Sequence, residues 1–375
     1  MHVQVRSCLS SIEGAQEMTI RKCPLTVLNI FLLITLLLPL SHVRAEVPLS
    51  GFGDVGFEAI KGDQTSFKDH FFHGQIDLFL TKNLSEKVNF LAEIVFELND
   101  ANEAVLDPER LLIQYYASPW LRVGAGRFHT ALGYWNEAYH HGSWLFAPIR
   151  RPSIFRLEDE GGILPVHLMG LEFRGEGGVG PGKFGYIANI GNGRGPQGDP
   201  PQIVNDSNTA KAINIQAYYL LPQFGNLRIG ANAYIDTMPG FDDPEIAGTT
   251  KVAAGDEQIY GFHLLWQPGD FELLTENFLI NHQYSSGEAT SRVLGHYTQL
   301  SHRFAEKYVP FVRYDLIQAG DEQDAYTGIA GTTQVGTIGL RYDLSETSAL
   351  KLEGSRQVGG SSPESRFAAN WAFTW

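Results

Sequence analysis

The chain has 375 residues, of which 42 are acidic and 28 are basic, giving a formal net charge of −14; 43% of the residues are hydrophobic and 12% are aromatic. An acidic surface of this kind argues against nucleic acid or anionic lipid head groups as primary partners. Both cysteines, Cys8 and Cys23, lie near the N-terminus. The rest of the chain therefore excludes a disulfide scaffold, thiol catalysis and cysteine metal sites.

The N-terminal segment has the pattern of a secretory signal peptide. Arg21 and Lys22 precede an apolar run, which ends near Pro39 and is followed by a polar stretch up to Ala45. A basic patch, an apolar core and a small final residue predict a signal peptide over residues 1–45, cleaved after Ala45. Met18 is the more natural start, so residues 1–17 are a candidate start-site extension. The alternative is a retained membrane anchor.

Residues 46–375 carry 24 basic and 40 acidic residues, a net charge of −16, with abundant glycine and no Pro/Ser-rich linker. These features favour a single all-β domain. Its segments alternate with period two. In residues 88–98 (VNFLAEIVFEL) and 336–344 (GTIGLRYDL), apolar side chains share one face and polar ones the other. A soluble sandwich also alternates, but strands of about ten residues with one apolar face suit a wall between lipid and water.

The connections alternate between short and long along the whole domain. Eight long connections are expected near residues 62–69, 99–108, 130–165, 191–209, 237–256, 283–290, 319–331 and 359–364, with seven short turns between them. Fifteen connections join sixteen strands, an even number that fits a closed transmembrane antiparallel β-barrel. The segments near 270–282 and 291–302 alternate poorly, so fourteen strands is an alternative within a possible range of 14–18.

The chain ends in RFAANWAFTW, where Phe367, Trp371, Phe373 and Trp375 fall on one face. Such rings facing outward near a barrel rim are typical of the interfacial girdle. The arrangement resembles the C-terminal assembly signal of bacterial outer-membrane barrels, carried here by Trp371, Phe373 and Trp375.

With these features the chain resembles the Gram-negative outer-membrane porin superfamily. The segment GAGRFHTALGYWNEAYHHGSW is most similar to the fifth strand and third external loop of porins related to the phosphate-selective porin O/P group. Gly126, Arg127, Phe128, Leu132 and Gly133 match, and Ala131 stands where many relatives carry proline. The resemblance implies that residues 130–165 form a long third external loop folded into the lumen. It also implies a bacterial outer-membrane location, a homotrimer, and lipid, lipopolysaccharide and the barrel-assembly machinery as partners.

Charges that line a wide pore set its selectivity. The candidate constriction and lining residues are basic and acidic side chains of the loop and of inward strand positions: Arg127, Arg150, Arg151, Arg156, Glu158, Asp159, Glu160, Arg122, Arg174, Arg228, Arg313, Asp315 and Arg341. For each one the alternative is an ion pair that braces the wall. Inward bases are matched by inward acids, which favours a general porin for ions and small hydrophilic solutes over an anion- or phosphate-specific channel.

Readings from other classes have less support. His129, His140 and His141 could bind a metal, but adjacent residues of an extended segment point apart, so pore-lining or packing histidines are preferred and neither a metal site nor a cofactor is expected. No Gly-x-Ser-x-Gly elbow is present. An enzyme is therefore not expected, and an outer-membrane hydrolase or a plugged structural barrel is the lesser alternative.

Overall fold

The computed structural model describes residues 49–63, 66–98, 103–140, 142–155, 163–195, 208–243, 250–252, 254–285, 290–320, 324, 329–360 and 363–375. The predicted signal peptide and both cysteines lie outside the described residues. Val47–Trp375 form one compact unit, and everything below concerns that unit.

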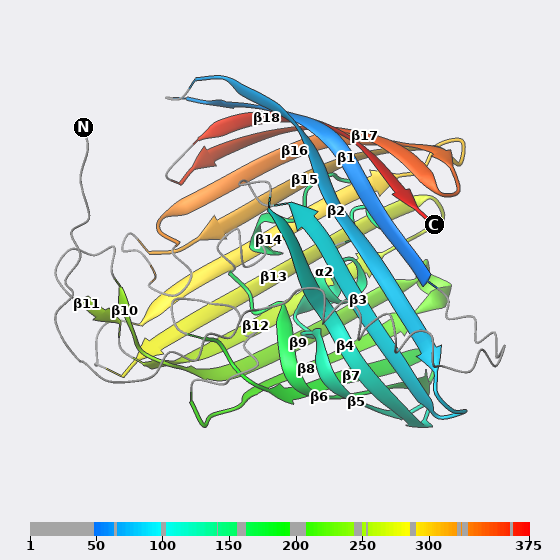
Figure 1. Cartoon of the computed structure of the whole chain (residues 1–375), viewed down its shortest axis with the longest axis vertical. Coiled ribbons are helices and arrows are strands. Elements are labelled where there is room, and N and C mark those ends of the chain that lie inside the picture. The colour runs from blue at the N-terminus through cyan, green and yellow to red at the C-terminus, as the bar shows by residue number, and fades with distance from the viewer. Residues whose placement is uncertain are drawn as a thin grey trace, which may run out of the picture. The chain divides into compact units, whose positions relative to one another are not determined.

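The unit is a closed antiparallel barrel of sixteen strands (Figure 1), which confirms the predicted fold class and strand number. Each strand pairs with its neighbours in chain order, and β18 pairs with β1 to close the ring. A separate two-stranded sheet, β10(Phe241–Asp243) with β11(Thr250–Val252), lies between β9 and β12. The barrel strands are β1(Leu49–Gly62), β2(Lys68–Asn83), β3(Val88–Leu98), β4(Ala104–Ser118), β5(Leu121–His129), β6(His167–Val179), β7(Gly182–Gly191), β8(Ala212–Leu221), β9(Leu227–Met238), β12(Gly255–Trp266), β13(Phe271–Tyr284), β14(Ser291–His302), β15(Tyr308–Gln318), β16(Thr332–Ser345), β17(Ser348–Gly359) and β18(Glu364–Thr374).

The connection between β5 and β6, residues 130–166, is the in-folded loop. It contains α2(Gly133–Ala138) and η1(Ser153–Phe155), and Figure 1 shows α2 inside the ring of strands. The only other described helix is the short η4(Pro222–Phe224), in the turn between β8 and β9. Among the described residues, no helix is both long enough and apolar enough to cross a membrane.

The main hydrophobic core lies inside the barrel, between the in-folded loop and the wall. Trp135, Phe155 and Leu164 of the loop pack in one cluster with Phe278 of β13 and Tyr297 of β14. The Trp135 and Phe155 rings stack with centroids 5.2 Å apart, and Phe155 meets Phe278 edge-on at 5.5 Å. The aromatic residues of the loop thus pack against the inner wall of the barrel.

This core also explains the poor alternation of β13 and β14. Their inner faces carry apolar residues such as Phe278, Ile280 and Val293, because the loop covers them. Their outer faces carry polar side chains such as Asn277 and His296. The usual alternation of apolar outward and polar inward residues is therefore weak on both faces of these strands.

Two irregularities re-aim side chains beside the loop. The register between β3 and β4 shifts between Glu93 and Ile94, which leaves Glu109 between two paired positions of β4. A bulge of this kind turns consecutive side chains toward the same side. On β5, Gly126 has φ +136°, and a Cβ there would lie 1.9 Å from the Leu111 carbonyl oxygen, so only glycine fits.

The final strand bears out the expected placing of its aromatic residues on the outer face. Phe367, Trp371 and Trp375 are each about half exposed, at 48%, 50% and 49%. The backbone of Trp375 exchanges two hydrogen bonds with Gly51, of 3.0 and 3.3 Å, and so ties the two ends of the barrel domain together. The role of these aromatic residues in assembly stays a prediction.

Candidate functional site: a charged cavity between the in-folded loop and the wall

The start of α2 is held by the far wall. Glu276 of β13 accepts hydrogen bonds from the backbone N–H groups of Tyr134 (2.7 Å) and Trp135 (2.8 Å). Gly133 precedes them with φ +79°, and a Cβ there would lie 2.1 Å from the Glu276 carboxylate. Gln216 of β8 donates to the Gly133 carbonyl at 2.9 Å. Asn232 of β9 accepts from the Gly133 N–H at 3.2 Å, so polar groups of three wall strands hold the start of α2, which has no side-chain cap.

The second half of the loop is held by β17. The Lys351 ammonium is fully buried and donates to the backbone carbonyls of Ser143, Phe146 (2.8 Å) and Pro148 (2.9 Å). Two residues along, Glu353 accepts from the backbone N–H of Ile149 at 2.8 Å. The Lys351 ammonium and the Glu353 carboxylate thus provide hydrogen-bond partners for buried backbone groups of the loop.

Between the loop and one side of the wall lies a cavity of about 1210 Å³. Strands β1, β2 and β15–β18 form the wall side, and the loop residues from His140 to Ser153 form the other. The ionisable groups that line it have both signs: Asp54, Glu58, Glu353 and Glu364 face Arg150, Arg151, Arg313 and Arg366, together with His70 and His140.

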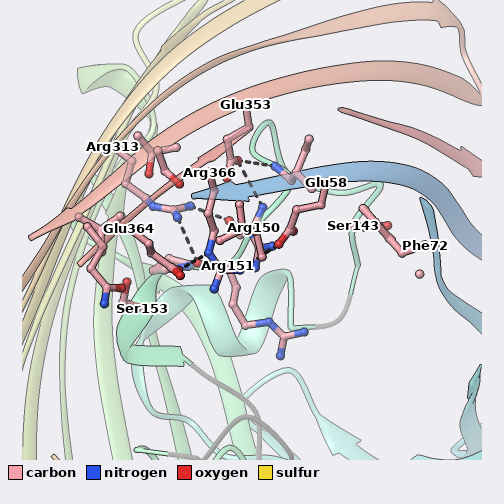
Figure 2. Close-up of a pocket in the computed structure, with 18 of the residues that line it drawn as sticks. Glu58, Phe72, Ser143, Arg150, Arg151, Ser153, Arg313, Glu353, Glu364 and Arg366 are labelled. Atoms are coloured by element: carbon pink, nitrogen blue, oxygen red, sulfur yellow. Dashed lines mark hydrogen bonds and ion pairs between the residues drawn. The ribbon is translucent and has the colours of Figure 1, made fainter. Parts of the chain in front are cut away.

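Most of these arginines are paired. Arg150 lies against the Glu58 carboxylate, whose other oxygen is 3.1 Å from Arg366 Nη1. Arg313 donates to Asp315 at 2.8 Å and to the carbonyls of Arg150 and Arg151 at 2.7 and 3.1 Å. Figure 2 shows Arg150 of the loop beside Glu58, with Arg313 and Arg366 of the wall close by.

Arg151 differs from the other arginines of the cavity. It lines the cavity and is only partly buried, and no described carboxylate lies within ion-pair distance of its guanidinium. Among the four described arginines that line the cavity, Arg151 therefore has the charge that the wall compensates least.

A second cavity, of about 220 Å³, lies between the loop and β3–β6. Arg122 and Arg174 line it with Glu137 and Glu172. Arg174 is 2.8 Å from Glu172 and 3.5 Å from Glu137. These two predicted residues thus lie on the other side of the loop from Arg150 and Arg151.

The remaining predicted residues are spread around the loop. Arg228 pairs with Glu137 at 3.0 Å and covers the Tyr218 ring at 3.7 Å. Arg341 donates to the Trp144 carbonyl at 2.5 Å. Asp315 accepts from the Ser153 N–H at 2.8 Å. These three hold the wall or the loop. Arg156, Glu158, Asp159 and Glu160 lie outside the described residues.

Two buried tyrosines, Tyr134 of α2 and Tyr139 directly after α2, carry neutral side chains. Burial raises the pKa of Tyr139 well above its usual range, and burial likewise raises the pKa of Tyr134. The Arg228 guanidinium lies 4.9 Å from the centre of the Tyr134 ring. Neither Tyr134 nor Tyr139 therefore contributes a phenolate charge near neutral pH.

Next to the loop's entry into the barrel, four buried side chains converge. One ligand atom each from Glu109, His129, His140 and His167 lies within 4.8 Å of every other. His129 and His140 stack with ring centroids 3.7 Å apart, and His167 meets His140 at 4.5 Å. Arg127, a predicted pore residue, is buried behind them and donates to the Glu109 carbonyl at 3.1 Å. His141 lies outside the described residues.

The outer end of the loop meets a further buried pair. The Arg194 guanidinium donates through Nε to both carboxylate oxygens of Glu257 at 2.9 Å, and through Nη2 to the Ile163 carbonyl at 2.5 Å. Arg194 follows β7 and Glu257 lies on β12, so the pair ties the loop's last turn to two distant parts of the wall.

Three functional groups were missed from the sequence. Glu364 and Arg366 line the cavity, and Arg366 lies on the face of β18 opposite to the aromatic residues, which is the signal that could have found it. Glu109 carried no signal, because the bulge breaks the period-two pattern there.

No protein-family model matches the sequence, and no curated protein matches it. Solved structures with the same fold do match. The outer membrane channel DcaP of Acinetobacter baumannii has a TM-score of 0.62 at 11% identity, over 88% of this chain and 97% of that one. An anion-selective porin from Comamonas acidovorans has a TM-score of 0.61 at 11% identity, over 88% and 99%. The trimer form of OmpT, an outer membrane protein of Vibrio cholerae, has a TM-score of 0.59 at 10% identity, over 88% and 99%. The chain therefore has the barrel fold of Gram-negative outer-membrane porins and channels.

Proposed function

We propose that the protein is an outer-membrane porin, a water-filled channel for passive diffusion of ions and small hydrophilic solutes, and that it is exported by a cleaved signal peptide. The single observation that carries this proposal is the cavity of about 1210 Å³, which the in-folded loop leaves open beside strands β1, β2 and β15–β18. The loop's apolar cluster includes residues of β4–β6, β8, β9 and β12–β15, so the loop covers that part of the wall and leaves a charged passage beside the rest. A plugged barrel would not need that passage.

The lining favours weak rather than strict ion selectivity. Four carboxylates and four arginines line the cavity, and most arginines have a carboxylate partner. A channel dedicated to phosphate requires a cluster of uncompensated cations, and here Arg151 alone fits that description among the described lining arginines. Opposed charges at a narrow point orient polar solutes and pass both ion signs.

Insertion of the purified protein into a planar bilayer tests the function. Stepwise conductance in KCl is expected, and the reversal potential under a KCl gradient is expected to be small. Insertion without conductance steps would favour the plugged barrel, and a reversal potential near the chloride limit would favour an anion-specific channel.

We propose further that the barrel forms a homotrimer through the outer face of β13 and β14. This face carries the outer polar strip, defined as Thr275, Asn277, His296 and Thr298. Thr275 and Thr298 hydrogen bond at 2.8 Å, as do His296 and Asn277. Polar groups on the lipid side of a barrel cost free energy, whereas a second copy of the chain would offer them partners.

A further inference from the structure

We propose that Glu109, His129, His140 and His167 form a binding site for one divalent transition-metal ion of the zinc class. The site borders the charged cavity through His140, and its role goes beyond the proposed channel function. Three imidazoles and one carboxylate are ligands that zinc prefers. The four ligand atoms already lie within 4.8 Å of one another, while those of a tetrahedral zinc site lie roughly 3.3 Å apart. Side-chain adjustments of about an ångström complete the geometry.

The four side chains come from four separate segments. Glu109 lies at the bulge of β4, His129 ends β5, His140 follows α2 and His167 begins β6. Their exposed fractions are 2%, 8%, 3% and 0%, respectively. A cluster assembled from distant segments and excluded from solvent has fixed geometry, which is what a structural metal site requires.

The hydrogen bonds of Asn136 fix the tautomer of His140. The Asn136 amide nitrogen donates to the carbonyls of Thr130 (3.0 Å) and Val166 (2.9 Å), so its oxygen is the acceptor that faces His140 Nδ1 at 2.7 Å. In the neutral ring Nδ1 therefore carries the proton, and the lone pair of Nε2 points at Glu109 Oε2, 3.4 Å away. Two electron-rich atoms face each other there, an arrangement that a cation between them stabilises.

The backbone and the charges around the cluster support the same site. His140 has φ +37°, a left-handed conformation that is uncommon for a non-glycine residue, and its ring lies in the cluster. Glu93 lies 3.7 Å from His129 and is paired with Arg110. On the other side of the cluster, Arg127 Nη2 lies 3.4 Å from His167 Nδ1 and 3.8 Å from the Asp107 carboxylate. His167 Nε2 contacts the Glu109 carboxylate. Ligation through His167 Nε2 requires the neutral tautomer that carries its proton on Nδ1, so the Arg127 guanidinium must turn away from Nδ1 when a metal binds.

An ion can reach the site from the lumen. His140 lines the large cavity and His129 lines the small one, so the cluster stands in the partition between them. Bound there, a metal would join the in-folded loop at His140 to three neighbouring wall strands.

The test uses the folded, tag-free barrel in detergent, with Zn²⁺ titrated against a chromophoric chelator and Co²⁺ as a spectroscopic probe. One tight equivalent of Zn²⁺ and the intense visible absorption of tetrahedral Co²⁺ are expected. His140→Ala and Glu109→Gln should each weaken binding at least about tenfold, and Asn136→Ala, which removes the partner of His140 Nδ1 together with the bonds to the Thr130 and Val166 carbonyls, about 10–100-fold. His70→Ala is the matched control, because His70 is exposed and lines the large cavity, and it should leave binding unchanged.

Wild-type protein without a tight equivalent overturns the proposal, as does binding that survives in His140→Ala. If a variant fails to fold, which heat-modified migration on gels reveals, the Co²⁺ spectrum of the wild type decides alone, and octahedral or absent spectra count against the site. Because binding is measured without conductance, failure here leaves the channel proposal standing, and the reverse also holds.

Discussion

The carboxylate of Glu276 accepts the backbone N–H of Trp135 at 2.8 Å, across 141 residues of sequence. Both groups are buried, and the same carboxylate also receives the Tyr134 N–H and the Tyr297 hydroxyl. The Glu276 carboxylate thus makes three of the buried hydrogen bonds around the start of α2.

Glu276→Gln is expected to destabilise the barrel by about 1–3 kcal/mol, because an amide cannot accept all three hydrogen bonds without presenting its own N–H groups to donors. Urea unfolding followed by tryptophan fluorescence measures the effect. Glu86→Gln, in the exposed turn between β2 and β3, is the control and should change little. Equal stability of the two variants would contradict the anchoring role of Glu276.

Lys351→Met is expected to loosen the loop rather than unfold the barrel. Methionine fills much of the space but leaves three buried carbonyls without the ammonium donor, at a cost of about 1.5–3 kcal/mol for charge-assisted bonds. Since residues 143–148 border the large cavity, single-channel conductance should rise and become noisier. Lys183→Met, at an exposed position of β7, should conduct like the wild type; if Lys351→Met does too, the β17 anchor does not limit the channel.

Arg151→Glu is expected to shift the channel toward cations. The substitution changes the lining charge by two units at the arginine without a carboxylate partner, so the reversal potential under a KCl gradient should move in the cation-selective direction. Lys183→Glu makes the same charge change away from the cavity and should leave the potential in place. If the reversal potential were unchanged in both variants, Arg151 would not contribute to ion selectivity at the constriction.

Arg194→Met is expected to cost about 3–5 kcal/mol, because it strands the buried Glu257 carboxylate. Adding Glu257→Gln to that variant should recover part of the loss, since a neutral amide is cheaper to bury than an uncompensated charge. Denaturant midpoints of the wild type, Arg194→Met and the double variant measure both changes in stability. A double variant that is less stable than Arg194→Met would show that Glu257 is stabilised mainly by other partners, such as His282 at 3.0 Å.

Asn277→Cys is expected to cross-link copies of the protein. Both natural cysteines lie in the predicted leader, so the mature chain would carry only the introduced thiol. A bifunctional thiol reagent should join subunits in membranes if the outer polar strip is the trimer contact. Leu111→Cys, on the exposed apolar face of β4 (51% exposed), should remain monomeric on denaturing gels. Cross-linking of Leu111→Cys alone would place the interface elsewhere.

Strand positions were largely predictable, because a wall between lipid and lumen forces alternation on each strand. The prediction was weakest for β13 and β14, where Phe278 faces inward because the loop covers it. That cover depends on contacts between segments more than a hundred residues apart, which local periodicity does not contain.

The site was predictable only in part. Arg150, Arg151 and Arg313 were expected near a constriction and do line the cavity. Separations along the sequence did not predict the histidine cluster, since barrel register brings His129 and His167 together as direct partners of β5 and β6. Glu109 joins them through a bulge that shifts its strand by one residue.

The loop contacts made by Lys351 have a consequence for the order of assembly. The ammonium reaches back 208 residues to Ser143, and β17 is the last strand but one before the seam between β18 and β1 closes. The contacts of Lys351 with the loop can therefore form only after β17 has been added, later than the contacts that Arg313 and Asp315 of β15 make with the same half of the loop. Pairings this remote in sequence form slowly. Closure of the seam and the last contacts of the in-folded loop thus both come late. A chain that stopped before β17 would be a partial sheet whose loop lacks the contacts with Lys351.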